Sequence, residues 1–151
     1  VDIHIDVNGV VSSHADHVPG VSDAPETHGT PEKPTDAAVS VPLIKLAWGR
    51  SGDKGNKANI GIIARKPEYL PYIWAALNAP MIGDVYGHFT DDPKAIERFL
   101  LPGSNAMNIL IDNILGGGGP ASLRNDAQGK GYAQLLLARS IPVSKDIAER
   151  L

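Results

Sequence analysis

The chain has 151 residues, of which 42% are hydrophobic, so it can bury one compact core of roughly 100 residues with further segments beside it. Its net charge of -3 disfavours nucleic acid as a partner, and the absence of cysteine excludes disulfides, thiolate zinc sites and a thiol nucleophile. No apolar run reaches the about 20 residues of a membrane span, and no signal peptide is recognisable, so we expect a cytoplasmic protein without a membrane partner.

Residues 1–16 predict a β-hairpin. Apolar and polar residues alternate from Val1 to Val7, which is the pattern of a half-buried strand. The Asn8-Gly9 pair that follows is typical of a two-residue type I′ turn. Because a lone hairpin is marginal in water, we interpret this segment as the tail of a larger domain. The start at Val1, without a methionine, fits a piece of a longer polypeptide.

Residues 17–40 predict a linker. Proline and glycine alternate there with Ser, Thr, Asp and Glu, and no apolar periodicity is present. The same composition fits a free, semi-rigid linker or an extended arm bound to a surface. The compact domain is expected to span residues 41–151.

The first half of this domain predicts two strands followed by two helices. The apolar runs 43–48 and 58–64 suit strands, and the second contains enough isoleucine for burial on both faces. Apolar residues recur at helical spacing after Pro67 as far as Leu77, and again over 81–89.

The second half predicts a strand and two further helices. The strand covers 96–101. The next helix covers 104–115, with Ser104 as its N-cap and Gly116 as its C-terminal stop. A last helix covers 128–139 and ends before Pro142.

A polar, glycine-punctuated segment between the first two strands is the first candidate site. Its two glycines permit positive φ and leave backbone N–H groups accessible, as in an anion-binding nest, and its lysines and arginine add positive charge. The alternative is an ordinary turn held by Asn and Asp side chains. A phosphate-binding P-loop is not indicated, because its spacing is absent. The candidate residues are Arg50, Ser51, Gly52, Asp53, Lys54, Gly55 and Asn56.

The second candidate site is the glycine run 116–119 with the polar residues after it. Four consecutive glycines lose much entropy on ordering, and close approach of the backbone to a strand, a ligand or another chain is the usual reason to keep them. A helix N-terminus beside basic side chains would also suit a phosphate or carboxylate. The alternative is a C-capping glycine and a flexible hinge. The candidates are Gly117, Gly118, Gly119, Ser122, Arg124, Asn125, Asp126 and Lys130.

The histidines predict neither a metal site nor a catalytic site. Four side chains could be drawn as a metal cluster: His4, His14, Asp16 and His17. We interpret them as exposed polar residues, because spacing of this kind is weakly specific. We interpret His88, Asp91 and Asp92 as a normal helix end and turn. No catalytic residue can be assigned, because no nucleophile and base stand in a recognisable order.

The segments VPLIKLAWGRSGDKGNKANIGIIARKPEYLP and ILGGGGPASLRNDAQGKGYAQLLL resemble the C-terminal, ferredoxin-like domain of the acyclic terpene utilisation A (AtuA) family. The resemblance covers residues 41–142 and adds Asn59, in the SGDKGN-x-ANIG motif, to the candidate residues. It implies an α+β fold, with helices packed on one face of a small ferredoxin-like sheet. A ferredoxin-like core requires one strand more than the pattern predicts, and 121–124 is the candidate.

The resemblance also implies a function in the catabolism of citronellol- and geraniol-type terpenes, or of related branched acids, as coenzyme A thioesters. It implies a larger AtuA-like N-terminal domain or subunit as partner, and no cofactor beyond the thioester substrate. We therefore expect part of a catabolic enzyme that associates into a homo- or hetero-oligomer. The alternatives are a purely structural oligomerisation module and, less favoured, an independent small enzyme.

Overall fold

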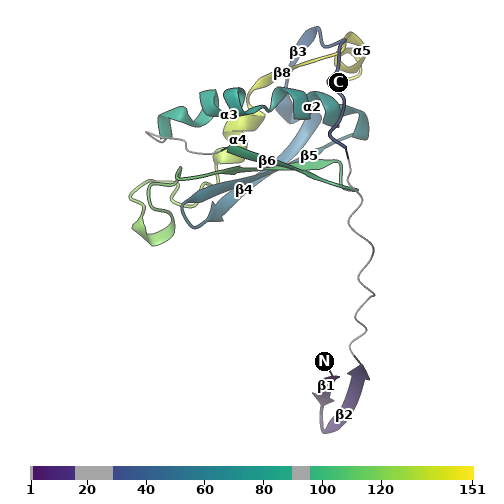
Figure 1. Cartoon of the computed structure of the whole chain (residues 1–151), viewed down its shortest axis with the longest axis vertical. Coiled ribbons are helices and arrows are strands. Elements are labelled where there is room, and N and C mark those ends of the chain that lie inside the picture. Colours follow the sequence, from purple (N-terminus) through teal and green to yellow (C-terminus); the bar gives the residue numbers. More distant parts are fainter. Residues whose placement is uncertain (1, 16–28, 90–95) are drawn as a thin grey trace.

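A computed structural model describes residues 2–15, 29–89 and 96–151 of the chain (Figure 1). Strands β1 (Asp2–Val7) and β2 (Val10–Ala15) form the predicted antiparallel hairpin, with Val7 paired to Val10. Asn8 and Gly9 connect them with φ of 55° and 80°, the two positive values that a type I′ turn requires. The hairpin is therefore confirmed, and its membership of a larger domain stays a prediction.

A four-stranded antiparallel sheet forms the centre of the compact domain. Its strand order is β4-β5-β7-β6, formed by β4 (Ala47–Lys54), β5 (Lys57–Ala64), β7 (Ala106–Ile111) and β6 (Ile96–Leu101). A second, two-stranded sheet pairs β3 (Val39–Pro42) with β8 (Ser140–Val143). The helices lie on one side of the four-stranded sheet, which confirms the predicted α+β class (Figure 1).

The helices of the described residues are short. Two of them confirm the helices predicted after Pro67 and over 81–89, and the side chain of Asn78 caps the second by accepting from Met81 N. Helix α4 packs on β4 and β5, and α3 packs on β6. The full set is α1 (Leu43–Leu46), η1 (Pro67–Tyr69), α2 (Leu70–Ala76), α3 (Ala79–Tyr86), η2 (Gly87–Phe89), η3 (Gly119–Ala121), α4 (Tyr132–Leu137) and α5 (Lys145–Glu149).

The helix predicted over 104–115 is wrong, because β7 occupies this segment in the middle of the sheet. Met107, Ile109 and Ile111 are buried and alternate with half-buried residues, which is a period of two and not of 3.6. Ser104 caps no helix, since its Oγ donates to Leu101 O in the turn between β6 and β7.

The strand suggested over 121–124 is also wrong, because Ala121 ends η3 and residues 122–124 form a loop. Strand β7 is the additional strand that the ferredoxin-like core required.

Three further boundaries differ from prediction. Leu43 and Leu46 belong to α1, where their spacing buries both, so the strand begins only at Ala47. The last predicted helix is shorter, since α4 covers only Tyr132–Leu137. Pro142 does not merely follow that helix: it lies in β8, which pairs with β3 alone among the described strands and so tolerates a missing N–H.

The described end of the proposed linker packs on the domain. Val39 and Ser40 are in β3, and Ala38 N donates to Val143 O at 2.8 Å. Asp36 accepts a hydrogen bond from Tyr72 Oη at 2.7 Å. The ordered domain therefore begins before Val41, whereas residues 17–28 of the linker lie outside the described part of the chain.

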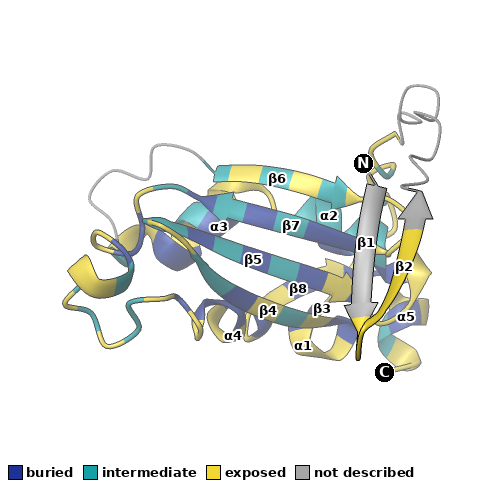
Figure 2. Ribbon diagram, turned by 90° about the horizontal axis from the view of Figure 1, so that it is seen from below, coloured by how far each residue is buried: buried dark blue, intermediate teal, exposed yellow. Residues whose placement is uncertain are grey.

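The core lies between the sheet and the helices. The side chains that β5 and β7 turn toward the helices are apolar and buried: Ala58, Ile60, Ile62, Ala64, Met107, Ile109 and Ile111. They pack with buried residues of the helices, such as Ile73, Ile82 and Leu136. The opposite face of the sheet is covered by none of the described helices (Figure 2).

Candidate functional site

The two sequence motifs meet at the tip of the β4–β5 hairpin. Asn56 Oδ1 accepts hydrogen bonds from Leu115 N at 3.2 Å and from Gly117 N at 2.8 Å. The main-chain oxygen of Asn56 accepts another from Ile114 N at 3.1 Å. One asparagine thus docks the hairpin tip onto the glycine-rich loop after β7.

The backbones of the two loops approach each other at Gly118. A Cβ at this position would lie 2.1 Å from Gly55 O, and Gly118 has a φ of 73°. Gly55 has a φ of 64°, the positive value that the first central residue of a type II′ turn needs. Close backbone approach, one of the two explanations for the glycine run, is therefore present in the structure.

Ser51 and Asp126 fix the start of α4. The buried Ser51 Oγ donates to Lys130 O at 3.1 Å and accepts from Ala133 N at 2.9 Å. The Asp126 carboxylate accepts from Lys130 N at 2.7 Å and from Gly131 N at 2.8 Å. Both side chains satisfy backbone N–H groups that a helix start leaves unpaired, so their main role is structural.

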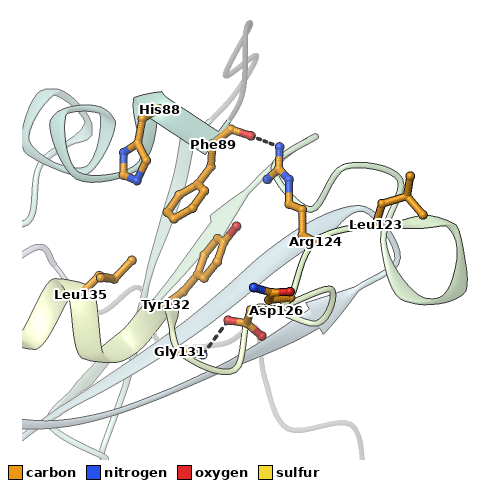
Figure 3. A pocket seen from close by; sticks show the side chains of 9 residues that line it. His88, Phe89, Leu123, Arg124, Asp126, Gly131, Tyr132 and Leu135 are labelled. Atoms are coloured by element: carbon orange, nitrogen blue, oxygen red, sulfur yellow. Dashed lines mark hydrogen bonds between the residues drawn. The ribbon is translucent and has the colours of Figure 1, made fainter.

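Arg124 connects three segments of the chain. Its guanidinium donates to Phe89 O, as Figure 3 shows, and to Ile114 O. Ser122 Oγ accepts from Arg124 N at 3.3 Å, which shapes the loop that carries the arginine. The guanidinium also lies 5.8 Å from the centre of the Phe89 ring.

A stack of three aromatic rings lies behind Arg124. The Tyr132 ring stacks between Tyr86, at 5.3 Å, and Phe89, at 5.1 Å. Burial raises the pKa of Tyr86 above its usual range, and its hydroxyl donates to Tyr132 O at 2.7 Å. Burial also raises the pKa of Tyr132, against the opposing effect of Arg124. Both phenols are therefore neutral at physiological pH and support the wall of a cavity.

This cavity has a volume of about 640 Å³ and a mixed lining (Figure 3). Its apolar lining comes from Phe89, Leu123, Tyr132 and Leu135, and its polar lining comes from His88, Arg124, Asn125 and Asp126. We call it the aromatic cavity. The motif predicted three of its polar residues, but not Tyr132 and Leu135, which the sequence pattern showed only as the apolar stripe of a helix.

A second hollow, of about 340 Å³, lies on the uncovered side of the sheet at the β4 edge. Its floor includes Gly52, Gly61 and Asn59, and its cations are Arg50, Lys54 and Lys130. We call it the cationic depression. Arg50 and Lys54 form no ion pair with any residue that the structure describes, which leaves both cations for an external anion.

Lys130 reaches the cationic depression from the loop before α4. Its Nζ lies 3.6 Å from Asp53 Oδ1. It also passes over Gly52, where an added Cβ would lie 3.1 Å from the ammonium nitrogen. Asn59 is fixed on the floor of the depression, because its Oδ1 accepts from Asn108 Nδ2 at 2.8 Å.

A third hollow, of about 490 Å³, has lining residues in common with each of the first two. It shares Asn125 and Asp126 with the aromatic cavity and Lys130 with the cationic depression. Gly119, Pro120, Ala127 and Gln128 complete its lining. We call it the connecting groove.

The predicted site residues therefore separate into two groups. Some face a hollow: Arg50, Gly52, Asp53, Lys54, Asn59, Gly119, Asn125 and Lys130. Others mainly hold the loops together: Ser51, Gly55, Asn56, Gly117, Gly118, Ser122, Arg124 and Asp126.

No group of three or more His, Asp or Glu side chains within the described residues is arranged to hold a metal ion. His88 is exposed, and its ring lies 4.0 Å from that of Phe89. The side chains of His4 and His14, and the whole of Asp16, His17, Asp91 and Asp92, lie outside the described part of the chain.

In the part of the chain that the structure covers, none of the helices is both long and apolar enough to cross a membrane.

The fold and these hollows define a small α+β module, with one layer of helices on an antiparallel sheet and polar loops gathered at one end of it. Residues 41–142, about two-thirds of the chain, match the family model of the AtuA ferredoxin-like domain. The chain belongs to this family. No curated protein and no solved structure gives a significant match.

Proposed function

We propose that this domain is an accessory or C-terminal module of an AtuA-like protein, and that it binds coenzyme A thioesters of acyclic terpenoid or related branched acids. The observation that supports the proposal best is that the three hollows are neighbours with shared lining residues. The aromatic cavity shares lining residues with the polar connecting groove, and the groove shares a lining residue with the cationic depression. A branched acyl-CoA has the same succession of an apolar chain, a polar arm and phosphates.

The aromatic cavity accommodates the acyl group. Tyr132 and Phe89 offer ring surfaces, and Leu123 and Leu135 add exposed aliphatic surface. Contact with apolar ligand surface is favourable by about 25 cal/mol per Å² removed from water. Asn125, which is exposed and lines the cavity, can donate its amide N–H to the thioester carbonyl oxygen.

The cationic depression accommodates the phosphates. Arg50, Lys54 and Lys130 line it, whereas Asp53 is the one acidic residue there. Lysine and arginine bind phosphate through charge-assisted hydrogen bonds, which are about twice as strong as neutral ones. Gly52 and Gly61 add no side chains of their own to the lining of the depression.

The reaction itself belongs, in this proposal, to a larger AtuA-like domain or subunit. The one serine in the lining of the three hollows, Ser51, is bonded to Lys130 O and Ala133 N and not to a base. The hairpin of residues 1–16 then belongs to the tail of that larger part. A cytoplasmic location completes the proposal, because it gives access to acyl-CoA metabolites.

Calorimetric titration with the coenzyme A thioester of citronellic acid tests this proposal. We expect Leu135→Asp to lower the affinity for the thioester about tenfold, because the new carboxylate faces the acyl chain. Leu151→Asp is a matched control, since Leu135 and Leu151 are 41% and 40% exposed and only the first lines the cavity. Free coenzyme A, which lacks the acyl group, should bind both variants like the wild type.

Two results would contradict the proposal. One is a thioester that binds no more tightly than free coenzyme A. The other is an affinity that Leu135→Asp leaves unchanged.

The second candidate function is a structural oligomerisation module without a ligand site. The interlocked loops favour it, because Asn56 and Gly118 contribute to packing and not to an open pocket. Absence of thioester binding together with a stable assembly would select this candidate.

A further inference from the structure

The uncovered face of the four-stranded sheet carries exposed apolar side chains on both edge strands and on β5. Trp48 on β4 is 52% exposed, Ile63 on β5 is 49%, and Phe99 and Leu101 on β6 are 44% and 45%. Arg65 orients the tryptophan, with its guanidinium 4.5 Å from the ring centre. Apolar surface of this kind, rimmed by charges, is typical of a protein interface.

The strand register arranges this face in rows, because directly paired residues project from the same side of a sheet. The first row, from β4 to β6, is Trp48, Ile63, Ala106 and Leu101. The second is Arg50, Gly61, Asn108 and Phe99. The third is Gly52, Asn59, Leu110 and Glu97.

Opposite charges lie on opposite edges of the face. The β6 edge carries the exposed carboxylate of Glu97. The β4 edge carries Arg50 and Lys54, and Lys130 lies beside Gly52. A single copy cannot pair these charges, since two strands separate β4 from β6 and strands lie about 4.8 Å apart.

Consider two copies that face each other across a two-fold axis, parallel to the strands and centred between β5 and β7. This axis places β4 of one copy over β6 of the other, and each row then faces the same row of the second copy. Trp48 then packs on Leu101 of the second copy, and Arg50 lies against Phe99. Glu97 points at Gly52, between Arg50 and Lys54, where the Lys130 ammonium that lies over Gly52 adds a third cation. The arrangement thus brings opposite charges of the two copies together.

We infer that the chain forms a homodimer through this face, with the two sheets packed about 10 Å apart. Four strands and six residues a strand give a contact of roughly 20 Å by 20 Å, which is small for a permanent dimer. The expected dissociation constant is therefore micromolar. The same geometry makes Glu97 of the second copy and a phosphate group alternative occupants of the cationic depression.

Sedimentation equilibrium of the full chain without ligand, from about 5 to about 200 µM, tests this dimer at concentrations that bracket a micromolar constant. We expect a monomer–dimer equilibrium in the wild type, weakened at least tenfold by Glu97→Arg and by Arg50→Glu. An equimolar mixture of the two variants should restore dimers. In the mixed dimer, one contact pairs the two exchanged charges and the symmetric contact keeps the original pair of Arg50 and Glu97. Glu68→Arg, an exposed charge reversal in η1 and away from this face, should dimerise like the wild type.

A wild type that remains monomeric to the highest concentration would overturn the inference. So would a dimer that both charge reversals leave intact, or two variants that are monomeric alone, retain the wild-type circular dichroism spectrum and fail to dimerise when mixed. The readout needs no thioester, so its result is independent of whether the chain binds coenzyme A derivatives.

Discussion

The two faces of the central sheet are made by the same strands, yet their residues differ in kind. Toward the helices, β5 presents Ala58, Ile60, Ile62 and Ala64, all buried. On the other side it presents Lys57, Asn59, Gly61 and Ile63, none of which is buried. Because neighbouring residues of a strand project to opposite sides, one segment supplies both a core and a surface. The comparison separates residues that stabilise the fold from residues that are available for recognition.

The interlocked loops belong with the stabilising residues, although their sequence suggested a ligand site. Asn56 bonds the backbone of the glycine-rich loop, and Gly118 packs against the backbone of the β4–β5 turn, so protein atoms occupy the space between the two loops. Arg50 and Lys54, from the same motif as Asn56, contact no anion among the described residues. A sequence motif can therefore contain both kinds of residue within one hairpin.

The largest difference in the free energy of unfolding between the two faces is expected for substitutions of two isoleucines on β5. Ile60→Ala should lower the free energy of unfolding by about 3 kcal/mol, because it leaves a cavity beneath the helices. Ile63→Ala should lower it by less than about 1 kcal/mol, since Ile63 is 49% exposed. Urea unfolding of the ligand-free chain, at concentrations where it is monomeric, measures both values. Equal losses would mean that the uncovered face supports the fold as much as the core does.

The glycine run allows a matched comparison within the interlocked loops. Gly118→Ala should lower the free energy of unfolding by about 2 to 3 kcal/mol, because the new Cβ collides with a main-chain oxygen and φ is positive. Gly119→Ala also has positive φ, but its Cβ would meet no atom within 4 Å. That change should cost about 1 kcal/mol. Thermal unfolding distinguishes the two, and an equal effect would show that conformation alone, without close packing, explains the glycines.

Local patterns predicted the hairpin turn, the strands 58–64 and 96–101 and the helices near 70–86, because their signals lie within a few residues. The error at β7 came from Leu110, Ile114 and Leu115, which complete a helical spacing with Met107. What decides the outcome is tertiary: β7 has a strand on each side, so its backbone bonds are satisfied by partners distant in the sequence. Strand β8 was missed because Pro142 is a strong helix stop and a poor strand former.

The candidate site could be predicted only in part, because local sequence signals do not show contacts between distant segments. Clustered glycine and charge identified both motifs, but not that Asn56 bonds a loop 61 residues later in the chain. The aromatic cavity depends on Phe89 and Tyr132, which only folding brings together. The sequence did not predict a role for Glu97, since the relevance of a single carboxylate on a strand depends on the cations at the opposite edge of the sheet.

The smallest effect on stability is expected at Lys54, which lies exposed on the recognition face. Lys54→Ala should change the free energy of unfolding by no more than about 0.5 kcal/mol. It should nevertheless weaken binding of the thioester and of free coenzyme A by about tenfold, because one charge-assisted hydrogen bond to phosphate is lost. Asp53→Asn is the informative partner variant: it removes the carboxylate 3.6 Å from Lys130 Nζ and should retain or increase phosphate affinity. Calorimetry and urea unfolding of both variants distinguish a role in phosphate binding from a role in stabilising the fold. If Lys54→Ala loses stability, the lysine belongs to the scaffold, and if its affinity for coenzyme A is unchanged, the phosphates bind elsewhere.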